Sequence, residues 1–177
     1  MRDGVVVRTA TSEDRSAILE LVLAAFSSVD HDGRQEVDIV TATWRLGVTP
    51  FDLELVAVED HAIVGHVLAA WGDLGGQAVV AVAPLAVSSS RQRQGTGSAL
   101  MNELVRRAEA AALPLIVLLG DPRYYERFGF EPSGPLDISY PVVGEDNPHF
   151  QVRRFAHYDR TLRGTFAYCW EMEDDRV

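Results

Sequence analysis

The spacing of hydrophobic and polar residues changes along the first part of the chain, from a pattern typical of a strand to one typical of helices. Val5–Arg8 is a short apolar run typical of a strand. Thr11 and Asp14 then have the spacing of a helix-capping pair, and apolar residues follow at helical spacing as far as Phe26. A second amphipathic stretch covers about 36–46. The pattern therefore predicts one strand followed by two helices.

The middle of the chain has the patterns of strands. Segments 53–59 and 63–71 are β-like runs, and Asp60-His61 between them is a plausible tight turn, which predicts an antiparallel hairpin. Segments 77–87 and 115–119 are almost entirely apolar. Continuous apolar runs of this kind are typical of strands that are buried on both faces.

A helix is predicted between these two apolar runs, because apolar residues recur at helical spacing over 98–112. A strand–helix–strand order is almost always a right-handed crossover between parallel strands. The early strands are expected to be antiparallel and this pair parallel. The sequence thus predicts an α/β (α+β) fold with a mixed central sheet and helices on both faces, in a single domain over residues 1–177.

The last third of the chain is less regular. A short helix is predicted after Asp121, ended by Gly129. Four prolines between 131 and 148 indicate a loop. Two further β-like runs, 149–155 and 165–172, predict a final hairpin.

Composition narrows the class of protein. The chain has 177 residues, 47% of them hydrophobic, and a formal net charge of -10. Such a charge argues against a nucleic-acid partner and an anionic membrane surface, and is compatible with a cationic substrate. All 16 basic residues are arginine, and the single cysteine, Cys169, excludes an intramolecular disulfide. The apolar runs are far shorter than the roughly 20 residues that span a bilayer. We expect a cytoplasmic protein.

The strongest chemical signal lies where the apolar run 77–87 passes into the next helix, at Gln92-Arg93-Gln94-Gly95-Thr96-Gly97. Amides at a helix start have no intrahelical partner, and the helix dipole makes them a site for anions. The two glycines let the backbone approach a bulky diphosphate. Arg91 and Arg93 add positive charge.

Three kinds of phosphate-binding loop could account for this segment. A P-loop requires a lysine, which the chain lacks, so it is excluded. The dinucleotide fingerprint fails at Leu100, where a small residue is needed. The third pattern, Gln/Arg-x-x-Gly-x-Gly/Ala of acetyltransferases, is matched from Gln92 to Gly97. The motif is short, so a simple turn remains the alternative at this point.

From about Val5 to Met172 the chain resembles the GNAT superfamily of N-acetyltransferases, in particular its YhbS-like branch. Besides the diphosphate loop, the resemblance rests on Pro84-Leu85-Ala86-Val87 and on the motif Tyr-x-x-x-Gly-Phe, matched from Tyr125 to Phe130. It implies a β-bulge at Pro84 that splays two parallel strands apart, with the pantetheine arm of acetyl-CoA in the gap. One departure is Ser89-Ser90, where Pro-Glu is common.

The resemblance also implies a site. Tyr125, with Tyr124 as the alternative, would be the general acid that protonates the leaving thiolate. An amide near Val87 would polarise the thioester carbonyl. The residues expected to bind acetyl-CoA are Leu85, Ala86, Val87, Gln92, Arg93, Gln94, Gly95, Thr96, Gly97 and Ser98.

The implied function is an acetyl-CoA-dependent N-acetyltransferase that acts on a primary amine of a small molecule or peptide by direct attack, and a homodimer is possible. The alternative is a catalytically silent acyl-CoA-binding sensor or interaction module. No metal is expected, because the histidines lack ligand spacing. Base candidates are Glu54, Glu59 and Asp73, while His66 could face the acceptor cleft; each also has a purely structural interpretation.

Overall fold

A computed structural model describes residues 4–28, 31–50, 52–143 and 147–172. The chain forms two compact units that interleave along the sequence. Unit 1 consists of Met1–Ala69 and Ala83–Arg107, and unit 2 consists of Ala70–Val82 and Ala108–Val177. The strands β3 (Ala62–Leu74) and β4 (Gln77–Val87) and the helix α3 (Thr96–Ala110) each contribute residues to both units.

Unit 1 contains the antiparallel strands β1 (Val6–Thr9), β2 (Glu54–Glu59) and the first part of β3, in that order. The two residues between β2 and β3, Asp60 and His61, have φ angles of 48° and 65°. Two consecutive left-handed residues are the geometry of a tight hairpin turn. The predicted hairpin is confirmed.

The two predicted N-terminal helices are present in unit 1 as α1 (Arg15–Phe26) and α2 (Arg34–Leu46). A 3₁₀ turn precedes α1, and in it the Thr11 amide donates to Asp14 Oδ2 over 2.8 Å. This is the predicted capping interaction. Helix α2 ends where Gly47 takes a left-handed conformation with φ 65°, which a residue without Cβ adopts at no steric cost.

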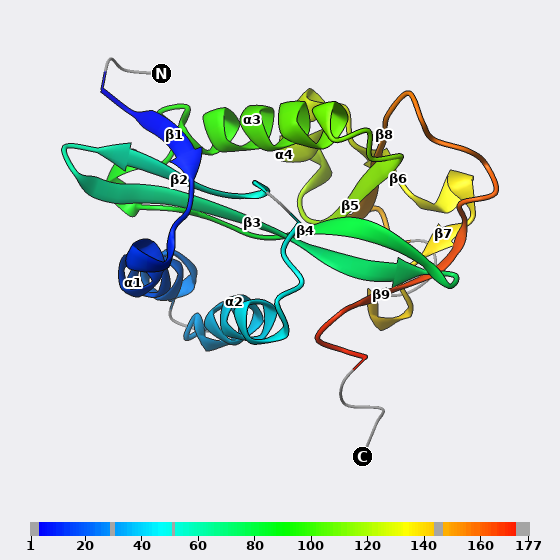
Figure 1. The fold of residues 1–177 in the computed structure, drawn as a ribbon, viewed down its shortest axis with the longest axis horizontal. Coiled ribbons are helices and arrows are strands. Elements are labelled where there is room, and N and C mark those ends of the chain that lie inside the picture. Colours follow the sequence, from blue (N-terminus) through cyan, green and yellow to red (C-terminus); the bar gives the residue numbers. More distant parts are fainter. Residues whose placement is uncertain (1–3, 29–30, 51, 144–146, 173–177) are drawn as a thin grey trace. The chain divides into compact units, whose positions relative to one another are not determined.

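The helices of unit 1 lie on both faces of its strands (Figure 1). One face carries a core cluster in which Ile18 of α1 and Val40 of α2 are packed with Val56, Leu68 and Ala86 from the strands. Gly65 faces the other way, because a Cβ at Gly65 would come within 2.9 Å of Leu100 in α3. Alternation along a strand thus separates α1 and α2 from α3.

Unit 2 contains the predicted parallel strand pair. Strand β4 pairs in parallel with β5 (Leu115–Leu119), from Val80 opposite Ile116 to Val82 opposite Leu118. On its other edge β5 pairs antiparallel with β8 (Phe150–Arg154). Parallel and antiparallel pairs therefore occur in one sheet, as the sequence predicted.

The predicted final hairpin is wrong. Strand β9 (Gly164–Tyr168) pairs antiparallel with the end of β3 and parallel with the short strand β7 (Ile138–Ser139), not with β8. Space explains part of this choice: a Cβ at Gly72 of β3 would lie 2.7 Å from a ring carbon of Phe166. The absent side chain leaves room for this ring, which is 1% exposed.

The proline-rich segment also holds more structure than a loop. Besides β7 it forms β6 (Glu131–Pro132), which pairs antiparallel with β8. Just before it, the predicted short helix is present as α4 (Pro122–Tyr125), continued by a 3₁₀ turn. Gly129 ends this turn with φ 79°, as the sequence predicted.

Candidate functional site

The proposed diphosphate loop connects β4 to α3 within unit 1 and has an unusual backbone. Arg93 and Gly95 have φ angles of 57° and 94°. The first i→i−4 hydrogen bond of α3 runs from the Ala99 amide to the Gly95 carbonyl over 2.9 Å. The amides of Thr96, Gly97 and Ser98 precede this bond, so they have no partner within the helix. Left-handed residues followed by free helix amides form a concavity suited to an anion.

Two glutamine side chains hold this loop together. Gln92 Nε2 donates to the Val87 carbonyl over 3.3 Å, which ties the loop to the end of β4. Gln94 Nε2 donates to the Ser90 carbonyl over 2.7 Å. Both are side chain to backbone bonds inside one short segment, so they order the loop without occupying the amides at the start of α3.

Of the two arginines expected to add positive charge at the loop, one is paired with a carboxylate. Arg91 forms an ion pair with Glu59 of β2, with its Nε 2.5 Å from Oε2, so much of its charge is neutralised. Arg93 is exposed. The contribution of Arg91 is therefore to fasten the loop to β2, while Arg93 is the cation left beside the helix start.

The start of α3 is seated closely on β3. Thr96 is 2% exposed, and its Cγ2 would lie 3.0 Å from a Cβ at Gly65. A larger residue at 65 would push the helix start away from the strand. Gly65 could not be singled out from the sequence, because only the packed structure shows that Thr96 and Leu100 lie above it.

The three β4 residues expected to bind acetyl-CoA differ in orientation. Ala86 is buried in the cluster beneath α1 and α2. Leu85 and Val87 are partly buried, and alternation along the strand points them to the other face. The peptide bond between Ala83 and Pro84 is cis. The splay of the two parallel strands beyond this point stays a prediction.

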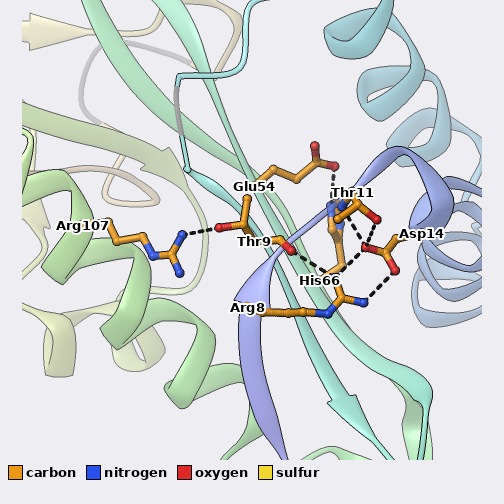
Figure 2. Close-up of polar contacts among 7 residues, drawn as sticks. All are labelled: Arg8, Thr9, Thr11, Asp14, Glu54, His66 and Arg107. Carbon is orange, nitrogen blue, oxygen red and sulfur yellow. Dashed lines mark hydrogen bonds and ion pairs between the residues drawn. The ribbon is translucent and has the colours of Figure 1, made fainter.

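A polar cluster, formed by Trp44, Glu54 and His66, lies on the same face of the strands as Ala86. Glu54 Oε1 accepts from Trp44 Nε1 over 2.9 Å and is 3.0 Å from His66 Nε2 (Figure 2 shows the second contact). The His66 side chain is fully buried, and that of Glu54 is 16% exposed. Of the base candidates, Glu54 is thus the one that contacts an indole and an imidazole side chain.

The other two carboxylates have structural partners. Glu59 is occupied by Arg91, and Asp73 accepts from the Gly76 amide over 2.9 Å in the turn between β3 and β4. Their structural interpretation is the better supported one.

One ion pair and one set of arginine hydrogen bonds, both drawn in Figure 2, connect elements of unit 1. Arg8 donates to both carboxylate oxygens of Asp14, over 2.7 and 2.8 Å, and this guanidinium holds the pKa of Asp14 well below its usual range. Arg107 donates to Thr9 Oγ1 over 2.6 Å and to the Asp52 carbonyl over 2.9 Å. Arg107 thus links α3 to β1.

Tyr125 lies in unit 2, at the end of α4, and its ring has a defined seat. A Cβ at Gly120 would lie 2.2 Å from Tyr125 Cε2, so the ring rests directly on the backbone of a residue without a side chain. The Phe130 ring meets it edge-on with centroids 5.9 Å apart. Burial, with a smaller contribution from Tyr124, raises the pKa of Tyr125 far above its usual value, so this phenol keeps its proton.

The neighbouring Tyr124 has a different environment. Its ring lies under the Arg127 guanidinium, whose carbon is 4.9 Å from the ring centroid. A cation above the ring and the edge of Phe128 beside it, 5.4 Å between centroids, explain its position. The two tyrosines therefore have distinct environments: the Tyr125 ring contacts Gly120, and the Tyr124 ring lies under Arg127.

Comparison with known proteins decides the family. Residues 52–132 match the model of the acetyltransferase (GNAT) domain. Over 115 residues the chain is 35% identical to the uncharacterized N-acetyltransferase YhbS of Escherichia coli K12, covering 63% of this chain and 67% of YhbS. The chain belongs to the GNAT family of acetyltransferases. The predicted family and branch are confirmed.

Solved GNAT structures share the fold over nearly the whole chain. The structure of YhbS from Escherichia coli in complex with CoA has a TM-score of 0.83 at 27% identity, covering 96% of this chain and 92% of YhbS. A GNAT acetyltransferase from Brucella melitensis in complex with acetyl-CoA has a TM-score of 0.76 at 28% identity, covering 93% and 95%. The predicted GNAT fold is confirmed.

The matched region contains the hairpin, the diphosphate loop and the Tyr125 motif. Trp44, which donates to Glu54, precedes this region, and its only sequence signal was its place on an amphipathic helix. Among the described residues, none of the helices is long and apolar enough to cross a membrane.

Proposed function

We propose that the protein transfers the acetyl group of acetyl-CoA to a primary amine of a small molecule or peptide. The observation that carries this proposal is the backbone at the start of α3, where Arg93 and Gly95 are left-handed and the next three amides precede the first helical bond. A diphosphate fits such a concavity, because it accepts from several amides at once and its charge is favoured by the helix dipole.

Different residues are proposed to order the loop and to bind each part of acetyl-CoA. Gln92, Gln94 and Arg91 order the loop. The amides from Arg93 to Ser98 bind the diphosphate. The backbone of Leu85 and Val87 pairs with the pantetheine arm, and Ala86 lies beneath it. When bound, acetyl-CoA supplies the thioester that the amine attacks.

Tyr125 is proposed as the general acid. Its support comes from unit 2 alone: the ring is held against Gly120, and the raised pKa keeps the hydroxyl protonated at neutral pH. A protonated donor is what a leaving thiolate requires. The structure of the Brucella melitensis relative contains acetyl-CoA, which supports acetyl-CoA as the acyl donor of this protein.

Calorimetric titration with acetyl-CoA, desulfo-CoA and ATP tests the proposal. We expect both coenzymes to bind and ATP not to bind. Gly95→Glu fills and charges the anion site and should abolish binding. Gly76→Glu is the matched control, because Gly76 is also left-handed, with φ 88°, and nothing lies within 4 Å of a Cβ there.

Equal affinity in wild type and Gly95→Glu would refute the placement of the loop. Failure of the wild type to bind either coenzyme would refute the function. Binding without CoA release in the presence of any primary amine would instead identify a silent acyl-CoA-binding module.

A further inference from the structure

Gly120 and Asp121 connect strand β5 to helix α4 within unit 2, and Tyr125 is the last residue of that helix. The Asp121 carboxylate accepts from the Arg123 amide over 3.0 Å and caps the helix. The Asp121 carbonyl accepts from the Tyr125 amide over 3.2 Å. The backbone of Tyr125 is thus tied to the residue that follows Gly120, so the position of Gly120 helps to set where the helix begins.

The Tyr125 ring turns back onto Gly120 with the edge that carries the hydroxyl. A Cβ at Gly120 would lie 2.2 Å from Cε2 and 3.2 Å from Cζ, the carbon that bears the hydroxyl. Tyr124 and Phe130 meet the same ring edge-on, with centroids 4.9 and 5.9 Å away. Because the ring is packed directly on Gly120, a displacement of Gly120 is passed on to the hydroxyl.

Gly120 is itself held from strand β8, which pairs with β5 (Figure 1). Its amide donates to the carbonyl of His149, the residue before β8, over 2.8 Å. Its carbonyl oxygen lies 3.0 Å from Gln151 Nε2 and 3.1 Å from His149 Nδ1. A carbonyl oxygen has two lone pairs, so it can accept from both side chains at once. Both backbone polar groups of Gly120 are therefore engaged.

The two side chains at the Gly120 carbonyl have different environments. Gln151 is 1% exposed, and its Nε2 also lies 3.4 Å from the His149 carbonyl. An amide nitrogen carries two N–H groups, so Gln151 can donate to both carbonyls. The His149 ring is exposed, and whether its Nδ1 donates depends on the tautomer. The buried amide is thus the side-chain donor that does not depend on a tautomer.

We infer that Gln151 is a positioning residue for the reaction: through the Gly120 carbonyl it sets where the Tyr125 hydroxyl lies. It acts on the reaction through the ring of the proposed general acid. Gln151 lies beyond residues 52–132, which match the GNAT domain model, so that match does not assign the role. The inference rests on the proposed function and adds a residue to its site.

The first test observes the Tyr125 ring in the free protein, by carbon nuclear magnetic resonance of tyrosine labelled at Cζ. The Tyr125 signal is assigned by its absence in Tyr125→Phe. We expect Gln151→Met, which keeps the length of the side chain but has no N–H donor, to shift this signal.

Arg154→Met is the matched control on the same strand. Arg154 lies at the other end of the β5–β8 ladder, opposite Leu115, and its Nε donates to Glu131 Oε1 over 2.6 Å. This variant also loses a side-chain donor of β8, but it should leave the Tyr125 signal in place. An unmoved signal in Gln151→Met, or equal shifts in both variants, would overturn the inference.

Turnover is the second test, with CoA release measured over a panel of primary amines. Gln151→Met should lower kcat by about 10-fold to 10²-fold, because a displacement of about 1 Å in a catalytic group can have an effect of that size. The calorimetric affinity for acetyl-CoA should stay unchanged. Urea denaturation shows beforehand that each variant is folded under the assay conditions.

A double-mutant cycle in kcat separates positioning from a merely structural role. In the Tyr125→Phe background the hydroxyl is absent, so Gln151→Met should have no further effect on kcat. Equal losses in both backgrounds would refute the positioning role. If methionine prevents folding, Gln151→Asn replaces it in both tests, since its amide is shorter by one carbon–carbon bond of about 1.5 Å and cannot reach the Gly120 carbonyl.

The two proposals fail in different ways. If acetyl-CoA does not bind, the proposed function fails, while a shifted Cζ signal still supports the placement of the ring by Gln151 and an unmoved one overturns it. If Tyr125→Phe lowers kcat and Gln151→Met does not, the inference fails and the proposed function stands.

Discussion

Replacing Gly120 by alanine tests how the Tyr125 ring is held. The new Cβ would lie 2.2 Å from Tyr125 Cε2 and 2.8 Å from Cδ2. Carbon atoms pack at about 3.5–4.0 Å, so the ring must move by at least about 1.3 Å. Overpacking of this kind costs about 1–3 kcal/mol. For a chain of this length each kcal/mol lowers Tm by about 2–4 °C.

A double-mutant cycle isolates this contact. Gly120→Ala is measured by urea denaturation in the wild type and again in Tyr125→Ala, where the ring is absent. We expect the destabilisation in the first background to disappear in the second, and even a gain of about 0.4–1 kcal/mol there, because alanine restricts the unfolded chain.

The same substitution reports on function, because a displacement of about 1 Å in a catalytic group can cost about 10²-fold in rate. An equal loss of stability in both backgrounds would refute the reasoning. It would mean that the cost arises from the Gly120 backbone, whose carbonyl accepts from Gln151 over 3.0 Å, and not from the ring.

Two further predictions follow from the described contacts. Asp14→Asn should lower the free energy of unfolding by about 1–2 kcal/mol at neutral pH, because the bonds to Arg8 and Thr11 are lost. Since the pKa of Asp14 is depressed in the folded state, this loss of stability should be complete above the unfolded pKa of about 3.9 and shrink as pH falls; a difference in urea midpoints that does not change with pH would contradict this. Tyr125→Phe should lower kcat by about 10²-fold with unchanged calorimetric affinity for acetyl-CoA, while Tyr124→Phe should not; the reverse result would transfer the acid role to Tyr124.

Local features of the chain were predictable because their causes lie within a few residues. The capping pair Thr11 and Asp14, the turn at Asp60-His61 and the end of the 3₁₀ turn at Gly129 are each set by backbone preferences of adjacent positions. The diphosphate loop belongs to the same class, since its glycines and the helix start are neighbours in sequence. The loop does lie at the start of α3, and Arg91 is paired with Glu59, while the binding of a diphosphate stays a prediction.

Contacts between distant segments could not be predicted in the same way. Sequence pattern identifies β9 as a strand, but its partner depends on where the Phe166 ring finds space, and that space is created by Gly72, 94 positions earlier by the numbering. The packing of Tyr125 against Gly120 and of α3 against Gly65 likewise depends on a glycine that is distant in sequence or unremarkable in pattern. A glycine in a sequence does not reveal which side chain fills the room it leaves.

The order of most elements and the loop proposed to bind the diphosphate could be predicted from the sequence, because periodicity and backbone preference act locally. The family followed from the resemblance of a few motifs. Tertiary structure alone decided that Trp44 and His66 meet at Glu54. It also made Glu54 differ from Glu59, which ends the same strand and is paired with an arginine. The partners of these two carboxylates are side chains that packing brings together from separate elements.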